Sequence, residues 1–203
     1  AGCAGVKTSF IPTVQMADLS GKTALVTGIA NKRSIAFAIA RDFAAQGAKL
    51  VIAYQAMGRD NEEERLRTLT ADLAPVLFEP MDVTKPETVE SLFNKVRETC
   101  GSLDVLVHAI ASAKREELDG RLSDTSLEGF LFAQQISAYS LIQLVKAARP
   151  LMTQGGSVLA LTYIGSDRAT ENYNVMGSAK ASLESLVRYL AMELGPGGVR
   201  VNA

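Results

Sequence analysis

The chain has 203 residues, enough for one domain with a sizeable core, and its hydrophobic content of 47% is that of a globular protein rather than a disordered one. The net charge is −1 and there is no basic run, which argues against binding to nucleic-acid phosphates. No apolar run approaches the length of a membrane span, and the two cysteines make no disulfide framework and suit a reducing compartment. With one histidine and no Cys/His cluster, we expect no metal site.

The first fifteen residues differ from the rest of the chain, because they contain no acidic residue and no clear periodicity. They fit an expression remnant, the remnant of a transit peptide, or a frayed native arm. We prefer the arm. The expected organisation is therefore an arm over residues 1–16 and one domain over residues 17–203.

Short apolar runs typical of buried strands alternate with helical patterns along the domain. The predicted strands are 23–27, 49–54, 76–79, 104–108, 158–162 and a last one that opens at 199–203. Helical patterns cover 35–46, 59–73, about 85–100, about 127–152 and 181–194, and the segments 84–87 and 125–128 have the form of capping boxes. This alternation predicts an α/β fold, a doubly wound parallel sheet of the Rossmann type.

The turn after the first strand has only one glycine, Gly28, so it fails the usual glycine-rich test for a dinucleotide site. Small residues, among them Ser34, still allow a phosphate to approach, and Ser34 either caps the next helix or donates to phosphate. At the end of the second strand a NAD site often has an acidic residue for the adenosine ribose, and a NADP site has an arginine. Here Gln55 stands at that place and Arg59 lies a little further on, so neither rule is met cleanly. Asp82 either accepts from an adenine amino group or caps a turn. We interpret His108 as structural.

Tyr173 and Lys180 are seven residues apart, nearly two helical turns. If the helix begins by Tyr173, both side chains lie on one face, roughly 10 Å apart along the axis. A lysine ammonium near a phenol lowers the tyrosine pKa, so we expect Tyr173 to favour the phenolate. The alternative is a helix surface on which the two groups never meet.

Together these residues resemble the short-chain dehydrogenase/reductase superfamily and, within it, the bacterial and plastid enoyl-acyl-carrier-protein reductases. The resemblance covers about Leu19 to Ala203. Met176 stands four residues before Lys180, where ordinary members of the superfamily have their tyrosine. The tyrosine lies one turn earlier, at Tyr173, with Tyr163 ten residues upstream, as in the enoyl reductase branch.

The resemblance implies that NADH delivers hydride to C3 of a trans-2-enoyl thioester. It implies that Tyr173 stabilises the enolate, Lys180 holds the nicotinamide ribose, and Tyr163 assists and lines the acyl site. The implied cofactor-binding residues are Gly28, Ser34, Ile35, Gln55, Asp82, Val83, Ile110 and Lys180. The implied substrate-binding residues are Ala113, Tyr163, Tyr173 and Met176.

The resemblance also implies an acyl carrier protein as partner, a homotetramer joined through the two long helices, and a location in the cytoplasm or, if residues 1–15 are a transit remnant, a plastid stroma. Family members continue past the position of Ala203 through the last strand and the substrate lid, so we expect this domain to be incomplete at its C-terminus. Ala109 and Ala111 stand where the family often has serine and glycine. A non-catalytic dinucleotide-binding regulator of the same fold is the alternative function.

Overall fold

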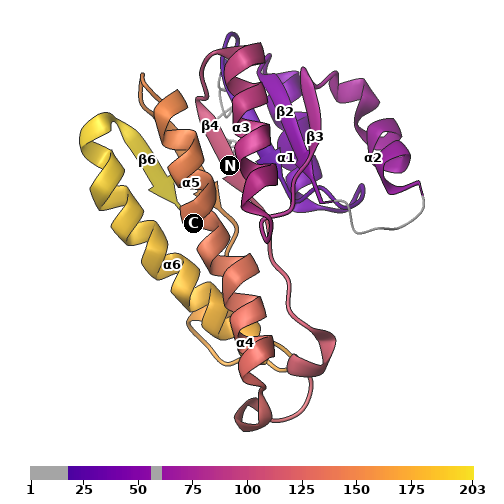
Figure 1. The fold of residues 1–203 in the computed structure, drawn as a ribbon, viewed down its shortest axis with the longest axis vertical. Coiled ribbons are helices and arrows are strands. Elements are labelled where there is room, and N and C mark those ends of the chain that lie inside the picture. Colours follow the sequence, from indigo (N-terminus) through magenta and orange to yellow (C-terminus); the bar gives the residue numbers. More distant parts are fainter. Residues whose placement is uncertain (1–17, 56–60) are drawn as a thin grey trace, which may run out of the picture.

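Six parallel strands form one sheet in the order β3-β2-β1-β4-β5-β6 (Figure 1). The computed structural model describes residues 18–55 and 61–203. The strands are β1 (Thr23–Thr27), β2 (Lys49–Tyr54), β3 (Leu77–Pro80), β4 (Val105–His108), β5 (Gly156–Ala160) and β6 (Val199–Asn202). The strand order reverses between β1 and β4, and in open α/β sheets ligands bind at the carboxyl ends of the strands beside such a switch point. The predicted doubly wound fold is confirmed.

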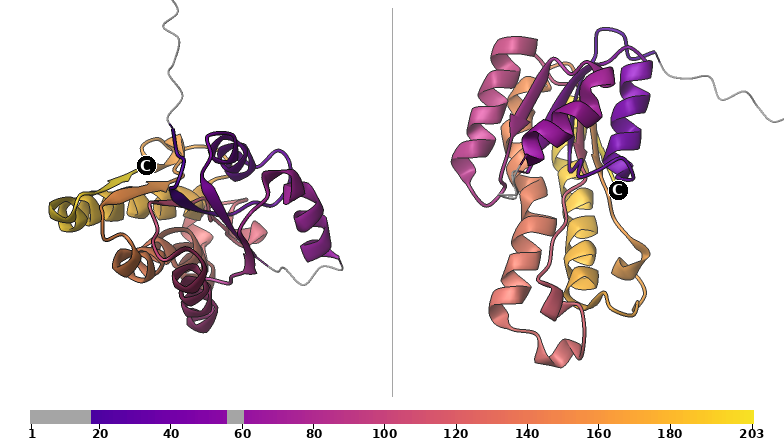
Figure 2. Two further views of the ribbon diagram at one scale, coloured as in Figure 1. Left: turned by 90° about the horizontal axis from the view of Figure 1, so that it is seen from above. Right: turned by 90° about the vertical axis from the view of Figure 1, so that its right-hand side faces the viewer.

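Helices cover both faces of the sheet (Figure 2). One face packs against α1 (Ile35–Ala45) and α2 (Glu62–Thr70). The other packs against α3 (Pro86–Cys100), α5 (Ser140–Ala148) and α6 (Asn174–Leu194). Because the strands are buried on both sides, they are nearly continuous apolar runs, and all five residues of β1 are buried. That is why the strand predictions agree with the structure to within two residues.

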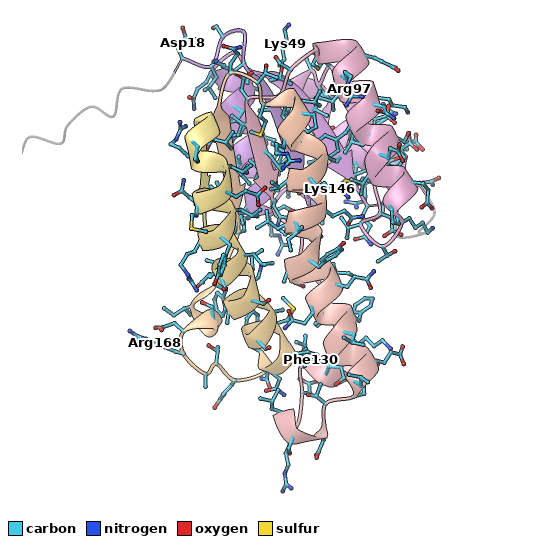
Figure 3. The ribbon with its side chains drawn as sticks, turned by 60° about the vertical axis from the view of Figure 1, so that its left-hand side comes forward. Asp18, Lys49, Arg97, Phe130, Lys146 and Arg168 are labelled. Atoms are coloured by element: carbon cyan, nitrogen blue, oxygen red, sulfur yellow. The ribbon has the colours of Figure 1, made fainter. Side chains whose placement is uncertain are left out.

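The long helix predicted up to Met152 is divided into several segments. It begins as α4 (Leu127–Gln134), passes through a π-helical turn, η4 (Gln135–Tyr139), and continues as α5 and a short 3-10 turn (Arg149–Leu151). Figure 1 shows α4 and the start of α6 projecting beyond the sheet at the end where β6 finishes. Figure 3 labels Phe130 on α4 and Arg168 on the segment before α6, both in this projecting part.

Both predicted capping boxes are wrong in detail. α3 begins one residue later than expected, with Lys85 at the N-cap, and the Thr84 side chain donates instead to the carboxylate of Asp82 at 2.7 Å. α4 is capped by Ser126, whose hydroxyl accepts from the amide of Gly129 at 2.9 Å. A four-residue pattern does not determine which of two neighbouring residues becomes the cap, because either can leave the helical conformation.

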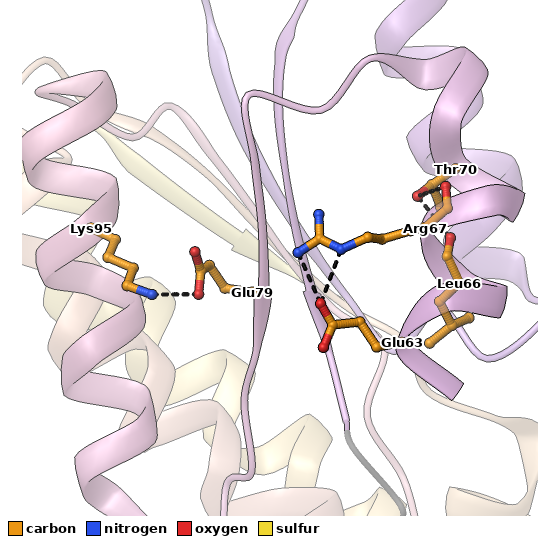
Figure 4. A network of polar contacts seen from close by, with 6 residues as sticks. All are labelled: Glu63, Leu66, Arg67, Thr70, Glu79 and Lys95. Carbon is orange, nitrogen blue, oxygen red and sulfur yellow. Dashed lines mark hydrogen bonds and ion pairs between the residues drawn. The ribbon is translucent and has the colours of Figure 1, made fainter. Parts of the chain in front are cut away.

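An ion pair joins α3 to the edge strand β3, and a cation–ring contact joins α2 to it (Figure 4). Lys95 of α3 contacts Glu79 of β3 at 2.6 Å. Within α2, Arg67 contacts Glu63 at 2.9 Å. The Arg67 guanidinium also lies 4.6 Å from the ring centroid of Phe78, so α2 covers the apolar face of this edge. Among the helices that the structure describes, none is long and apolar enough to cross a membrane.

Candidate functional site

A cavity of about 500 Å³ opens at the carboxyl ends of β1, β4 and β5. Gly28 lines it, with a φ of +83°, and a Cβ atom there would lie 2.0 Å from the carbonyl oxygen of Ala109. The buried Thr27 hydroxyl ties the two strand ends together, donating to Val107 O at 2.8 Å and accepting from the Ala109 amide at 3.2 Å. No side chain other than glycine's hydrogen fits between the ends of β1 and β4.

The large cavity collects six of the predicted site residues. Its lining includes Gly28, Ser34, Ile35, Tyr163, Tyr173 and Lys180. A second cavity, of about 180 Å³, shares Gly28 with the first and lies on the β2 side, where Gln55, Val83 and Ile110 line it. The two cavities thus lie next to each other along the strand ends, which suits an elongated ligand.

Ser34 closes the turn that leads into α1. Its hydroxyl oxygen accepts from the backbone amides of Ala30 at 3.1 Å and Asn31 at 3.0 Å, and it makes no capping bond to the helix. Both acceptor positions are therefore in use, and the hydroxyl hydrogen remains available to a group in the cavity. This favours the phosphate-donor alternative over the cap.

Tyr163 and Tyr173 meet edge to face at one side of the large cavity. Their ring centroids are 4.7 Å apart with an interplanar angle of 61°. α6 begins at Asn174, immediately after Tyr173, so the condition for a shared face with Lys180 is met. The Lys180 ammonium is almost completely buried and donates to the carbonyl oxygen of Leu161 at 2.6 Å. Leu161 in turn donates its amide to the carbonyl of His108 at 2.9 Å, so the lysine is anchored to the end of β4.

The expected phenolate at Tyr173 is wrong. Burial raises the pKa of Tyr173, and the neighbouring Tyr163 raises it further. Burial also lowers the pKa of Lys180, whose charge is held by a carbonyl rather than by the phenol. Desolvation disfavours the charged form of both groups. At neutral pH Tyr173 therefore carries its proton and can act as a hydrogen-bond donor.

His108 is completely buried behind this site. Its Nε2 atom lies 2.7 Å from the hydroxyl of Ser140, which donates to Ile136 O at 2.6 Å. Nδ1 has no hydrogen-bond partner within the part of the chain that the structure describes. Burial lowers the pKa of His108 to about 3, and the charge of Lys180 adds to the effect. The ring is thus neutral, which agrees with its interpretation as structural.

Comparison with known proteins decides the family. A family model described as enoyl-(acyl carrier protein) reductase matches residues 28–203. A Nostoc sp. relative named enoyl-acyl-carrier-protein reductase (NADH) is 51% identical over 188 residues, which cover 93% of this chain and 73% of the relative. A Staphylococcus aureus relative named for NADPH is 47% identical with the same coverage. The crystal structure of the Anaplasma phagocytophilum reductase in complex with NAD matches with a TM-score of 0.87 at 42% identity, covering 91% of this chain and 70% of that one. The chain belongs to the enoyl-(acyl carrier protein) reductase family.

Three residues expected in the reductase site line neither of these two cavities. The Asp82 carboxylate accepts from the amide and the hydroxyl of Thr84, at 2.9 and 2.7 Å, which is the turn-capping alternative, and Asp82 does not line either cavity. Ala113 and Met176 pack behind Tyr173 in a small apolar cluster with Ala133 and Val175. Their roles in binding stay predictions, and the structure gives them a packing role beside the reductase site.

Other lining residues were missed by the sequence reasoning. Leu161, Thr162, Thr170 and Glu171 line the large cavity, and so do Ala109 and Ala111. Leu161 and Thr162 follow β5 directly, as Ala109 and Ala111 follow β4, and this position marks them because ligands bind at strand carboxyl ends. Thr170 and Glu171 lie further on, before α6. Arg59, the other residue considered for cofactor choice, lies outside the described residues. Among the described residues, no group of His, Cys, Asp and Glu side chains can hold a metal ion.

Proposed function

We propose that this protein reduces the trans-2 double bond of enoyl thioesters carried by acyl carrier protein, with NADH as reductant. The observation that carries the proposal is the meeting of Tyr163, Tyr173 and Lys180 in one cavity beside Gly28. NAD fits the site, because two neighbouring cavities lie along the strand ends and Gly28, at the turn into α1, lines both, where a pyrophosphate can approach backbone amides. Bound NADH would supply the hydride.

Tyr173 would stabilise the reaction by donating its proton-bearing hydroxyl to the thioester carbonyl. Addition of hydride at C3 builds negative charge on that oxygen, and a donor already in position lowers the free energy of the transition state. The raised pKa of Tyr173 keeps the donor protonated. Tyr163, 44% exposed and in ring contact with Tyr173, would line the acyl site and assist.

Lys180 would hold the hydroxyls of the nicotinamide ribose. Its ammonium is fixed by the Leu161 carbonyl, so its remaining hydrogens are directed by the fold rather than by solvent. Ser34 would bind the pyrophosphate with its available hydroxyl hydrogen. Gln55, Val83 and Ile110 would contact the adenosine half in the smaller cavity.

Preference for NADH rests on Gln55, whose amide can bond a ribose hydroxyl but offers no charge to a 2′-phosphate. The relatives carry both names, NADH in Nostoc and NADPH in Staphylococcus aureus. Catalytic efficiencies with the two cofactors test this preference. Equal or better use of NADPH would contradict it.

An oxidation assay tests the activity. NADH consumption is followed with a trans-2-enoyl thioester of acyl carrier protein, and a 3-oxoacyl thioester serves as the control for the ketoacyl reductase reaction. We expect NADH to be consumed with the enoyl substrate only. Consumption with neither substrate, despite NADH binding, would favour the regulatory alternative, to which the reductase family and the three site residues give no support.

A homotetramer remains part of the proposal. Leucines of the two long helices are largely buried within the chain: Leu141 and Leu144 are fully buried, and Leu190 is 8% exposed. Other apolar side chains on the same helices are exposed and supply the surface, namely Leu127, Leu131, Tyr139, Tyr189 and Met192. The expected location, in the cytoplasm or a plastid stroma, stays a prediction.

A further inference from the structure

The backbone at Gly165 lies so close to the rings of Tyr163 and Tyr173 that there is no room for a side chain. A Cβ atom at Gly165 would lie 2.6 Å from Cδ1 of Tyr173 and 3.1 Å from Cδ1 of Tyr163. Its φ is not positive, so glycine is needed here because a side chain would have no room, and not because of the backbone conformation. The carbonyl of the same residue rests on α6, where a Cβ at Gly177 would lie 2.8 Å from it.

Glu184 holds both ends of the segment that carries Tyr163. One carboxylate oxygen, Oε1, accepts from the hydroxyl of Thr162 and from the hydroxyl of Ser166, each at 2.6 Å. These hydrogen bonds lower the pKa of Glu184, Ser166 having the larger effect, so the carboxylate is charged at neutral pH. Thr162 immediately precedes Tyr163, and Ser166 ends the 3-10 turn η6 (Ile164–Ser166).

α6 places these contacts by its periodicity. Tyr173, Gly177, Lys180 and Glu184 follow one another at intervals of four, three and four residues, the spacing of one helix face. One face of α6 therefore carries the phenol of Tyr173, the contact of Gly177 with the Gly165 carbonyl, the ammonium of Lys180 and the carboxylate of Glu184. Tyr163 is 44% exposed, and an exposed side chain on a connecting segment has a fixed ring geometry only if its backbone is held.

We propose that Gly165, Gly177 and Glu184 are positioning residues that set the separation and angle of the Tyr163–Tyr173 ring pair. The inference rests on the proposed function, in which both phenols face the substrate. The glycines let the segment approach α6 closely, and Glu184 fixes it along the helix. Both contacts are needed, because Gly177 limits the distance between the Tyr163 segment and α6, whereas Glu184 limits movement of the segment along the helix.

The test reads the ring geometry directly, in addition to activity. The protein is labelled with ¹³C-tyrosine, whose five residues give few ring signals, and Tyr163→Phe and Tyr173→Phe assign the pair. Gly165→Ala adds only a methyl group. Glu184→Ala removes the acceptor, whereas Glu184→Gln keeps one side-chain carbonyl oxygen able to accept from both hydroxyls. Gly197→Ala is the matched control, because no atom lies within 4 Å of a Cβ there and its φ is not positive.

Gly165→Ala and Glu184→Ala are expected to move the ring signals of Tyr163 or Tyr173 and to lower kcat by roughly 10–100-fold, as displacement of a reacting group by about 1 Å does. NADH affinity should stay within about twofold in the same variants, since Lys180 and Ser34 are untouched. Glu184→Gln should keep the ring signals and most of kcat. Gly197→Ala should change neither.

Unchanged ring signals in folded Gly165→Ala and Glu184→Ala would overturn the inference, and so would moved signals with an unchanged kcat. Absence of enoyl reduction by the unsubstituted protein would instead contradict the proposed function. In that case the ring signals alone still decide whether Gly165 and Glu184 position the pair.

Discussion

Burial sets the protonation states of the single residues at the site. Tyr173 has a raised pKa and keeps its proton, while Lys180 has a lowered one, and both shifts have desolvation as their first cause. The donor and the cation therefore act as separate groups. Lys180 is bound to Leu161, and Tyr173 lines the cavity.

Separate roles predict separate effects of substitution. Tyr173→Phe should lower turnover by about 10²–10³ and leave the Kd for NADH unchanged, because only the enolate loses its donor. Lys180→Ala should weaken NADH binding as well as turnover, because the ribose loses its partner. NADH binding by fluorescence titration and steady-state turnover measure the two effects. Tyr189→Phe, at an exposed position on α6, is the matched control. Equal loss of NADH affinity in Tyr173→Phe would contradict the assignment.

His108 predicts how stability depends on pH. Its folded-state pKa, about 3, is below its usual 6.5, so the fold binds its proton less well than the unfolded chain. The contribution of the neutral His108 side chain to the free energy of unfolding is therefore fully present above pH 6.5 and is lost as the pH falls toward 3. In that window, each pH unit should cost wild type up to about 1.4 kcal/mol more than His108→Asn. Urea unfolding at several pH values measures this, and parallel slopes for the two proteins would contradict a buried neutral histidine.

At the scale of elements, the parallel strands were the easiest part to predict. Buried parallel strands are apolar runs, and their carboxyl ends mark the site before any side chain is placed. The resemblance then supplied Gly28, Ser34, Tyr163, Tyr173 and Lys180, which do line one cavity. Their catalytic and binding roles stay predictions.

Other features depend on packing that a linear pattern does not contain. The π-helical turn η4 has the same apolar spacing as an α-helix over so few residues, yet it brings Ser137 to Ser112 at 3.0 Å and leads to Ser140 beside His108. The pKa direction of Tyr173 follows from burial, which spacing to Lys180 does not reveal. The Asp82 carboxylate accepts from the nearby hydroxyl of Thr84, a local hydrogen bond that competes with any ligand.

Gly21 and Gly28 lie just before and just after β1, and we expect them to respond differently to substitution by alanine. Gly28 and Gly21 both have positive φ, +83° and +78°, but only Gly28 faces a close atom, since nothing lies within 4 Å of a Cβ at Gly21. Gly21→Ala should cost about 1–2 kcal/mol from conformation alone. Gly28→Ala should cost about 2 kcal/mol more and weaken NADH binding. Chemical unfolding and NADH titration measure both, and equal losses in the two variants would contradict a close approach to Ala109.

At the scale of the whole molecule, several exposed apolar side chains lie on the helices of one side of the sheet, while Ile35 of α1 is exposed on the other. On α6, Tyr189 is 67% and Met192 72% exposed. Burying large apolar side chains of this kind stabilises association by roughly 1.5–3 kcal/mol each. The side of the sheet covered by α5 and α6 is therefore the surface that the proposed tetramer would use.

Met192→Glu should shift the protein toward smaller assemblies, because a carboxylate in an apolar interface must be desolvated without a partner. Light scattering across a dilution series measures the mass. Ala38→Glu on α1, also at an exposed position but on the opposite face of the sheet, adds the same charge outside the proposed surface and should leave the mass unchanged. A monomeric unsubstituted protein, or equal masses for the two variants, would contradict the assignment of this surface.

The central claim is that the phenols of Tyr163 and Tyr173 stabilise the charge that forms when an enoyl thioester is reduced. The most direct measurement is the rate of NADH-dependent enoyl reduction by the Tyr163→Phe, Tyr173→Phe double variant, with NADH binding measured in parallel. The account predicts retained binding and a rate lowered by at least about 10²-fold. An unchanged rate would mean that neither phenol acts on the reacting carbonyl and that the catalytic centre has been misplaced.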